Sequence, residues 1–88
     1  MIRKRVVIEG RVQNVGFRAS CTQRARTAGV SGTVRNLADG RVEAVFEGPA
    51  TAVDALVAWC GHGPPMAHVD RVAVIEEAPL GETAFHVT

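Results

Sequence analysis

The segment Gly10–Arg18, G-R-V-Q-N-V-G-F-R, holds the residues best suited to bind an anion. It follows alternating residues typical of a strand and precedes residues with helical spacing. A strand-to-helix turn directs backbone N–H groups and the positive end of a helix dipole toward one point, which favours phosphate. The guanidinium of Arg18 could add a two-pronged contact. The segment lacks the G-K-[ST] ending of a P-loop, and its spacing alone also fits a plain connection with an exposed arginine.

Hydrophobic spacing predicts the elements that must position this segment. Strands are expected over Arg3–Glu9, Gly32–Asn36, Val42–Glu47 and Val69–Glu77, with a short edge strand over Phe85–Thr88. One helix is expected to begin at Phe17 and end at Gly29, and a second to begin at Gly48-Pro49, with Thr51 and Asp54 as a capping box. This order, β-α-β-β-α-β, is typical of the α+β class with a ferredoxin-like, split β-α-β fold, in which two helices cover one face of an antiparallel sheet.

The predicted topology brings two distant features together. The first two strands run parallel with the third strand between them, so their C-terminal ends, Gly10 and Asn36, share one edge of the sheet. Two strand spacings separate these ends, about 10 Å. Arg18 and Asn36 could therefore face one phosphate-sized pocket.

Two segments of the chain resemble the signatures of the acylphosphatase family: Gly10–Arg18, and G-T-V-R-N-L-A-D-G-R-V over residues 32–42. Glu47-Gly48-Pro49 and Gly63-Pro64 also look like the family, so the resemblance covers residues 1–88 as one domain. In that family the loop amides and the loop arginine bind the phosphoryl group, and an asparagine holds the attacking water. The resemblance thus assigns phosphate binding to Gln13, Asn14, Val15, Gly16, Phe17 and Arg18, and catalysis to Arg18 and Asn36.

The resemblance implies hydrolysis of acyl phosphates to a carboxylate and inorganic phosphate, with phosphate and other small anions as inhibitors. An amide such as Asn36 can orient water but cannot usefully accept its proton near neutral pH. No Ser/His or Cys/His set implies a covalent intermediate, and no carboxylate cluster implies a metal, so no cofactor is expected. Because nothing activates the leaving group, the site favours acyl phosphates over alkyl phosphates.

Asn14 departs from the family pattern, which usually has glycine in V-Q-G-V. If the position needs a positive φ, asparagine is the least costly substitute for glycine. We therefore expect the loop to keep its shape.

Composition and charge argue against several partners. The formal net charge of +1 gives no strong case for nucleic acid or an anionic membrane. No apolar run approaches the ~20 residues of a membrane span, and no apolar stretch of a signal peptide follows the basic residues after Met1. A monomeric protein of the cytoplasm is therefore expected.

The remaining chemically versatile side chains are expected to be structural. Without ligand or C-x-x-C spacing, the cysteines are expected in the core and the histidines on the surface. The expected core positions are Cys21, Cys60 and, in part, Trp59; the expected exposed side chains are His62, His68, His86 and, in the loop, Arg11 and Gln13. A disulfide between the two helices is conceivable but disfavoured in the cytoplasm.

Two other functions stay open. The same fold could bind phosphate, carbamoyl phosphate or a metabolite without turnover. Similar domains form part of larger hydrogenase-maturation carbamoyl transferases. An RNA-binding module would need aromatic residues on the open sheet face for base stacking. The chain has no tyrosine, and Phe46 and Phe85 form no such paired motif, which argues against RNA.

Overall fold

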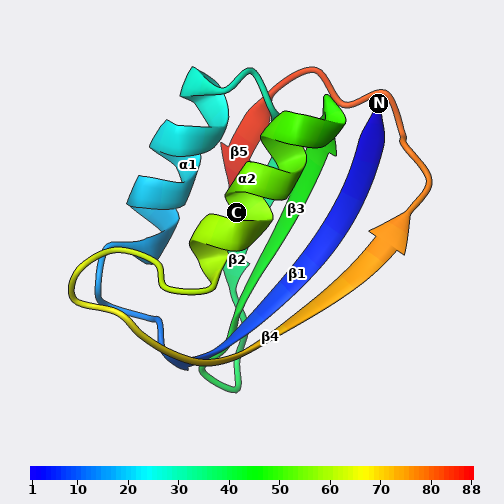
Figure 1. The fold of residues 1–88 in the computed structure, drawn as a ribbon. Helices are drawn as coiled ribbons and strands as arrows, with labels where there is room; N and C mark the ends of the chain where they lie inside the picture. Colours follow the sequence, from blue (N-terminus) through cyan, green and yellow to red (C-terminus); the bar gives the residue numbers. More distant parts are fainter.

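All 88 residues are described by the computed structural model, in which two helices pack on one face of a five-stranded sheet (Figure 1). The strands are β1 (Ile2–Arg11), β2 (Ser31–Asn36), β3 (Val42–Gly48), β4 (His68–Glu77) and β5 (Phe85–Val87), and the helices are α1 (Phe17–Thr27) and α2 (Ala50–Cys60). They follow one another as β1-α1-β2-β3-α2-β4-β5, which confirms the ferredoxin-like fold predicted from the sequence.

The strand order within the sheet is β4-β1-β3-β2-β5. β3 pairs antiparallel with both β1 and β2, so these two strands run parallel on either side of it, as predicted. Val42 of β3 is the register partner of Ile8 on one side and of Asn36 on the other. Ile8 and Asn36 therefore lie level with each other, and β1 continues beyond that level to Arg11. β5 makes the sheet mixed, because it pairs in parallel with β2.

The core lies between the sheet and the helices. Alternation places Val6 and Ile8 of β1 on the helix-facing side, where both are fully buried. Phe17, the first residue of α1, is 2% exposed, and its ring centroid lies 5.1 Å from that of Trp59 on α2. Burying a side chain of this size stabilises the fold by about 1.5–3 kcal/mol. The N-terminus of α1 is therefore anchored to the core.

The end of α1 follows the sequence prediction. Gly29 has a φ of +70°, and its amide donates to the carbonyl of Arg26. The Val30 amide donates to the carbonyl of Ala25 at 2.9 Å. These two hydrogen bonds form a Schellman motif, in which glycine takes the left-handed position at no steric cost.

The capping box predicted at the start of α2 is wrong. Pro49 occupies the N-cap position, and no side chain caps the helix. Asp54 instead accepts a hydrogen bond from Nζ of Lys4 at 2.8 Å, which joins α2 to β1. A capping box joins the N-cap residue to the third helical residue, whereas Thr51 is the second residue of α2 and Asp54 the fifth.

The cysteines and histidines lie where the sequence predicts. Cys21 and Cys60 are buried free thiols, and desolvation raises the pKa of Cys21 to about 12. His62, His68 and His86 are all exposed. Neither helix has the length and apolarity that a membrane crossing requires.

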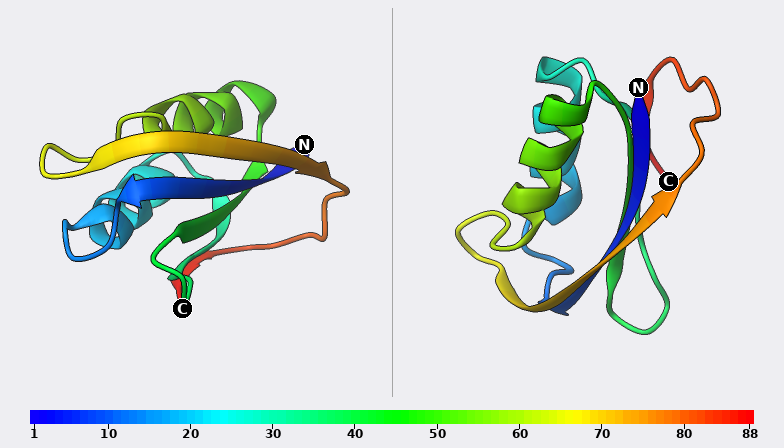
Figure 2. Two further views of the ribbon diagram at one scale, coloured as in Figure 1. Left: turned by 90° about the horizontal axis from the view of Figure 1, so that it is seen from below. Right: turned by 45° about the vertical axis from the view of Figure 1, so that its right-hand side comes forward.

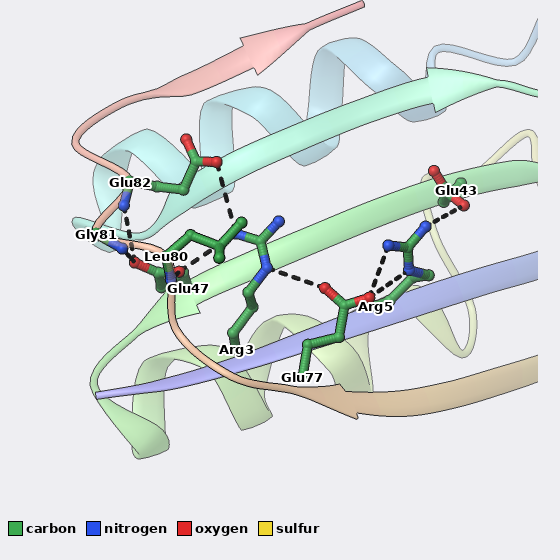
Figure 3. A network of polar contacts seen from close by, with 8 residues as sticks. All are labelled: Arg3, Arg5, Glu43, Glu47, Glu77, Leu80, Gly81 and Glu82. Carbon is green, nitrogen blue, oxygen red and sulfur yellow. Dashed lines mark hydrogen bonds and ion pairs between the residues drawn. The ribbon is translucent and has the colours of Figure 1, made fainter.

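A network of ion pairs covers one end of the sheet face opposite the helices (Figure 3). The carboxylate of Glu47, 3% exposed, accepts hydrogen bonds from the amides of Leu80, Gly81 and Glu82 at 2.7–2.9 Å, and from Nη1 of Arg3 at 3.2 Å. These contacts hold the connection between β4 and β5, which passes over this face (Figure 2, right). The network lies at the N-terminal end of β1, away from the start of α1 (Figure 1).

The pKa of Glu47 makes this attachment pH-dependent. The hydrogen bond from the Leu80 amide, followed by those from Glu82, Arg3 and Gly81, lowers the pKa below its ordinary value of 4.5, although desolvation acts to raise it. A carboxylate with a lowered pKa in the folded state stabilises the fold above the unfolded pKa, and this contribution is lost as the pH falls through the folded pKa.

Glu47→Gln is therefore expected to lower the melting temperature at about pH 7, because its amide group would face backbone donors and lose the charge. The difference from the unsubstituted protein should shrink as the pH falls below 4.5 and through the lowered pKa of Glu47 in the folded state, because the carboxyl then becomes protonated. Thermal unfolding followed by circular dichroism over a series of pH values measures this. Glu76→Gln, at an exposed carboxylate without an ion pair, is the control. Equal effects of the two substitutions near neutral pH would contradict the prediction.

Candidate active site

Three residues with positive φ shape the end of β1 and the segment that joins it to α1. Gly10 (φ +131°) lies at an irregularity in the β1–β4 register, where a Cβ would collide with the His68 carbonyl oxygen. Asn14 has a φ of +62° and is the one non-glycine residue with positive φ, so the position does need the conformation that asparagine tolerates. Gly16 (φ +78°) is the N-cap of α1. The backbone thus leaves β1 and turns directly into the first turn of the helix.

The N-terminus of α1 has no anionic partner within the protein. No side chain caps it, and its first turn contains no acidic residue. The last turn carries Arg24 and Arg26, which complement the negative end of the dipole. The free N–H groups and positive potential at the first turn are therefore available to an external anion.

A small pocket opens at this helix end. Its volume is ≈ 160 Å³, and it is lined by Val12, Asn14, Gly16, Phe17, Arg18, Ala19 and Asn36. Arg18 and Asn36 thus share one pocket although they come from α1 and β2. Of the other predicted phosphate-binding residues, Asn14, Gly16 and Phe17 line it, whereas Gln13 and Val15 do not. Pockets for drug-sized ligands measure about 300–1,000 Å³, so this one suits a group of phosphoryl size.

Two polar groups in the pocket have no partner in the protein. The Oδ1 atom of Asn36 is buried and accepts no hydrogen bond. Buried polar atoms are nearly always hydrogen-bonded, so this oxygen is suited to accept one from a bound molecule. The guanidinium of Arg18 is exposed and makes no ion pair, unlike those of Arg3 and Arg5. An acceptor for a water molecule and a free cation therefore lie in one small pocket.

A larger hollow of ≈ 500 Å³ lies between α1 and α2, but it lacks the unpartnered oxygen that the smaller pocket contains. The guanidinium of Arg24 there lies over the Trp59 ring, 5.1 Å from its centroid. No buried polar atom without a partner faces this hollow, since Asn36 Oδ1 is the only such atom. No group of three or more His, Cys, Asp or Glu side chains is placed to hold a metal ion.

The side chain of Gln13 is not exposed, contrary to the sequence prediction. It is half-buried, and its Nε2 donates to the carbonyl oxygens of Leu37 and Arg41 at 2.8 and 3.0 Å. These acceptors are backbone atoms 24 and 28 residues away. Because any residue can supply a backbone carbonyl, the sequence carries no signal for this contact.

A family model described as Acylphosphatase matches residues 4–87 of the chain. This chain belongs to the acylphosphatase family. Acylphosphatase from Rubrobacter xylanophilus is 62% identical over 79 residues, which cover 90% of this chain and 72% of that protein. The crystal structure of acylphosphatase from Bacillus subtilis is 36% identical with a TM-score of 0.95, covering 100% of this chain and 99% of that one. HypF of T. kodakarensis is 31% identical with a TM-score of 0.85, covering all of this chain but 12% of HypF.

These matches confirm the family that the two signature segments predicted, and with it the class of reaction. Acylphosphatases hydrolyse acyl phosphates, and the chain is a hydrolase acting on acid anhydrides. The likeness to HypF involves a small part of a much longer protein, whereas both acylphosphatases are matched over most of their length. The enzyme is therefore favoured over the binding module.

Proposed function

We propose that this acylphosphatase acts by direct attack of a water molecule, held by Asn36, on a phosphoryl group bound by the loop amides and Arg18. The observation that carries the proposal is the pocket at the start of α1, where the unpaired guanidinium of Arg18 and the unpartnered Oδ1 of Asn36 lie together. The loop amides from Gln13 to Phe17 are the expected donors to the phosphoryl oxygens.

Each group has a limited role. Arg18 and the amides place positive charge around the phosphoryl oxygens and align the group for attack. The Asn36 oxygen accepts a hydrogen bond from water and so orients its lone pair toward phosphorus; it does not take the proton. Because phosphoryl transfer passes through a loose transition state, positioning and charge suffice when the leaving group departs readily. A carboxylate is such a leaving group, and an alkoxide is not.

The proposal includes a small acyl phosphate as substrate and inorganic phosphate as a competitive inhibitor, since both carry the group that the pocket fits. We also propose a monomer in the cytoplasm that uses neither nucleic acid nor a membrane as partner. The two free thiols agree with a reducing compartment.

Hydrolysis of a simple acyl phosphate in ¹⁸O-labelled water tests whether water attacks the phosphorus atom or the carbonyl carbon. Attack at phosphorus places the label in inorganic phosphate and none in the carboxylate, which mass spectrometry of both products measures. Label in the carboxylate would mean attack at the carbonyl carbon and would overturn the mechanism. An alkyl phosphate is the matched control substrate, because it presents the same phosphoryl group with a poor leaving group. Its efficient hydrolysis would contradict the leaving-group argument.

A further inference from the structure

Gln13 makes contacts that the proposed mechanism does not use. Its side-chain amide donates hydrogen bonds to two backbone carbonyls of the turn between β2 and β3, those of Leu37 and Arg41, and so uses both of its N–H groups. Leu37 directly follows Asn36, and Gln13 directly precedes Asn14. The hydrogen bond to Leu37 therefore begins and ends one residue away from residues that line the pocket.

These bonds are the only hydrogen bonds between the loop of residues 12–16 and the turn of residues 37–41. β1 and β2 do not pair with each other, because β3 lies between them. The turn is closed by its own bonds, from the Leu37 amide to the Arg41 carbonyl and from the Gly40 amide to the Leu37 carbonyl, at 2.8 and 3.2 Å. Gln13 thus ties the loop to a turn that is already ordered.

We propose that Gln13 is a positioning residue that sets the distance between the phosphoryl-binding loop and Asn36. This inference rests on the proposed function, in which the loop binds the phosphoryl group and Asn36 holds the water. A misplacement of about 1 Å between reacting groups can cost about a hundredfold in rate. The loop amides and Arg18, which bind the phosphoryl group, all lie on the same side of these two hydrogen bonds as the loop. Loss of the two bonds should therefore slow the attack by water and leave phosphoryl binding intact.

Gln13→Met tests this, since methionine keeps the length of the side chain and removes both donors. We expect kcat for a simple acyl phosphate to fall about tenfold or more, with KM and the inhibition constant of inorganic phosphate within about threefold. Gln23→Met, at an exposed glutamine of α1 without hydrogen bonds, is the matched control and should match the unsubstituted protein. An unchanged kcat, or a phosphate affinity that falls in step with kcat, would overturn the inference. Rates are compared at a temperature where thermal unfolding shows every variant folded.

A double-mutant cycle with Asn36→Ala shows whether Gln13 acts through Asn36. If it does, Gln13→Met lowers kcat much less when Asn36 is already removed. An equal fold-loss in both backgrounds would overturn the positioning role. If Asn36→Ala alone leaves kcat unchanged, the proposed mechanism fails. If Asn36→Ala is impaired and Gln13→Met is normal, only the inference about Gln13 fails.

Discussion

Arg18→Ala is expected to lower kcat/KM for acyl phosphates by about a thousandfold or more, with little change in stability. The guanidinium is exposed and makes no ion pair or hydrogen bond within the protein, so its removal breaks no contact of the fold. In the proposed complex it supplies two charge-assisted hydrogen bonds to the phosphoryl oxygens. Steady-state hydrolysis measures the rate, and competition by inorganic phosphate measures the loss of affinity.

Two further variants separate the geometry of Arg18 from its charge. Arg71→Ala removes the same charge from an exposed position on β4 and should change kcat/KM less than about threefold, because screening limits the reach of surface charges. Arg18→Lys keeps the charge but loses the planar fork, so its activity should lie between those of the alanine variant and the unsubstituted protein. If Arg71→Ala were as damaging as Arg18→Ala, the overall electrostatic potential of the protein would explain the loss of activity. The proposed contact between Arg18 and the phosphoryl group would then be wrong.

The position of the candidate site could be predicted because it depends on topology. Alternating residues reveal the strands, and the β-α-β-β-α-β order places β3 between β1 and β2. That arrangement brings the C-terminal part of β1 and Asn36 to one edge of the sheet, where Ile8 and Asn36 both pair with Val42 of β3. The sequence also indicated that Asn14 could take the place of glycine if the position needs a positive φ, and its φ is +62°.

The contacts that the sequence did not predict join a side chain to backbone atoms distant in the chain. Gln13 donates to the carbonyls of Leu37 and Arg41, and Glu47 accepts from the amides of residues 80–82. Backbone groups are the same in every residue, so no pattern of residue types marks them as partners. The capping box failed for a different reason: α2 begins at Ala50 with Pro49 as its N-cap, so Thr51 already lies inside the first turn.

Asn36→Ala is expected to lower kcat by about a hundredfold or more while KM changes little. The substitution removes the acceptor that orients the water and leaves the loop amides and Arg18 in place to bind the phosphoryl group. Ser31→Ala, which removes a half-buried hydroxyl from the same strand outside the pocket, is the control and should leave kcat unchanged. Single-turnover hydrolysis separates the attack from product release.

Stability distinguishes this role from a structural one. The Oδ1 atom of Asn36 is buried and receives no hydrogen bond from the protein, so its removal breaks no hydrogen bond of the fold. The melting temperature should therefore change little, while the rate falls. A variant that loses stability and activity together would indicate that Asn36 supports the strand, and one that keeps full kcat would show that the water is held elsewhere.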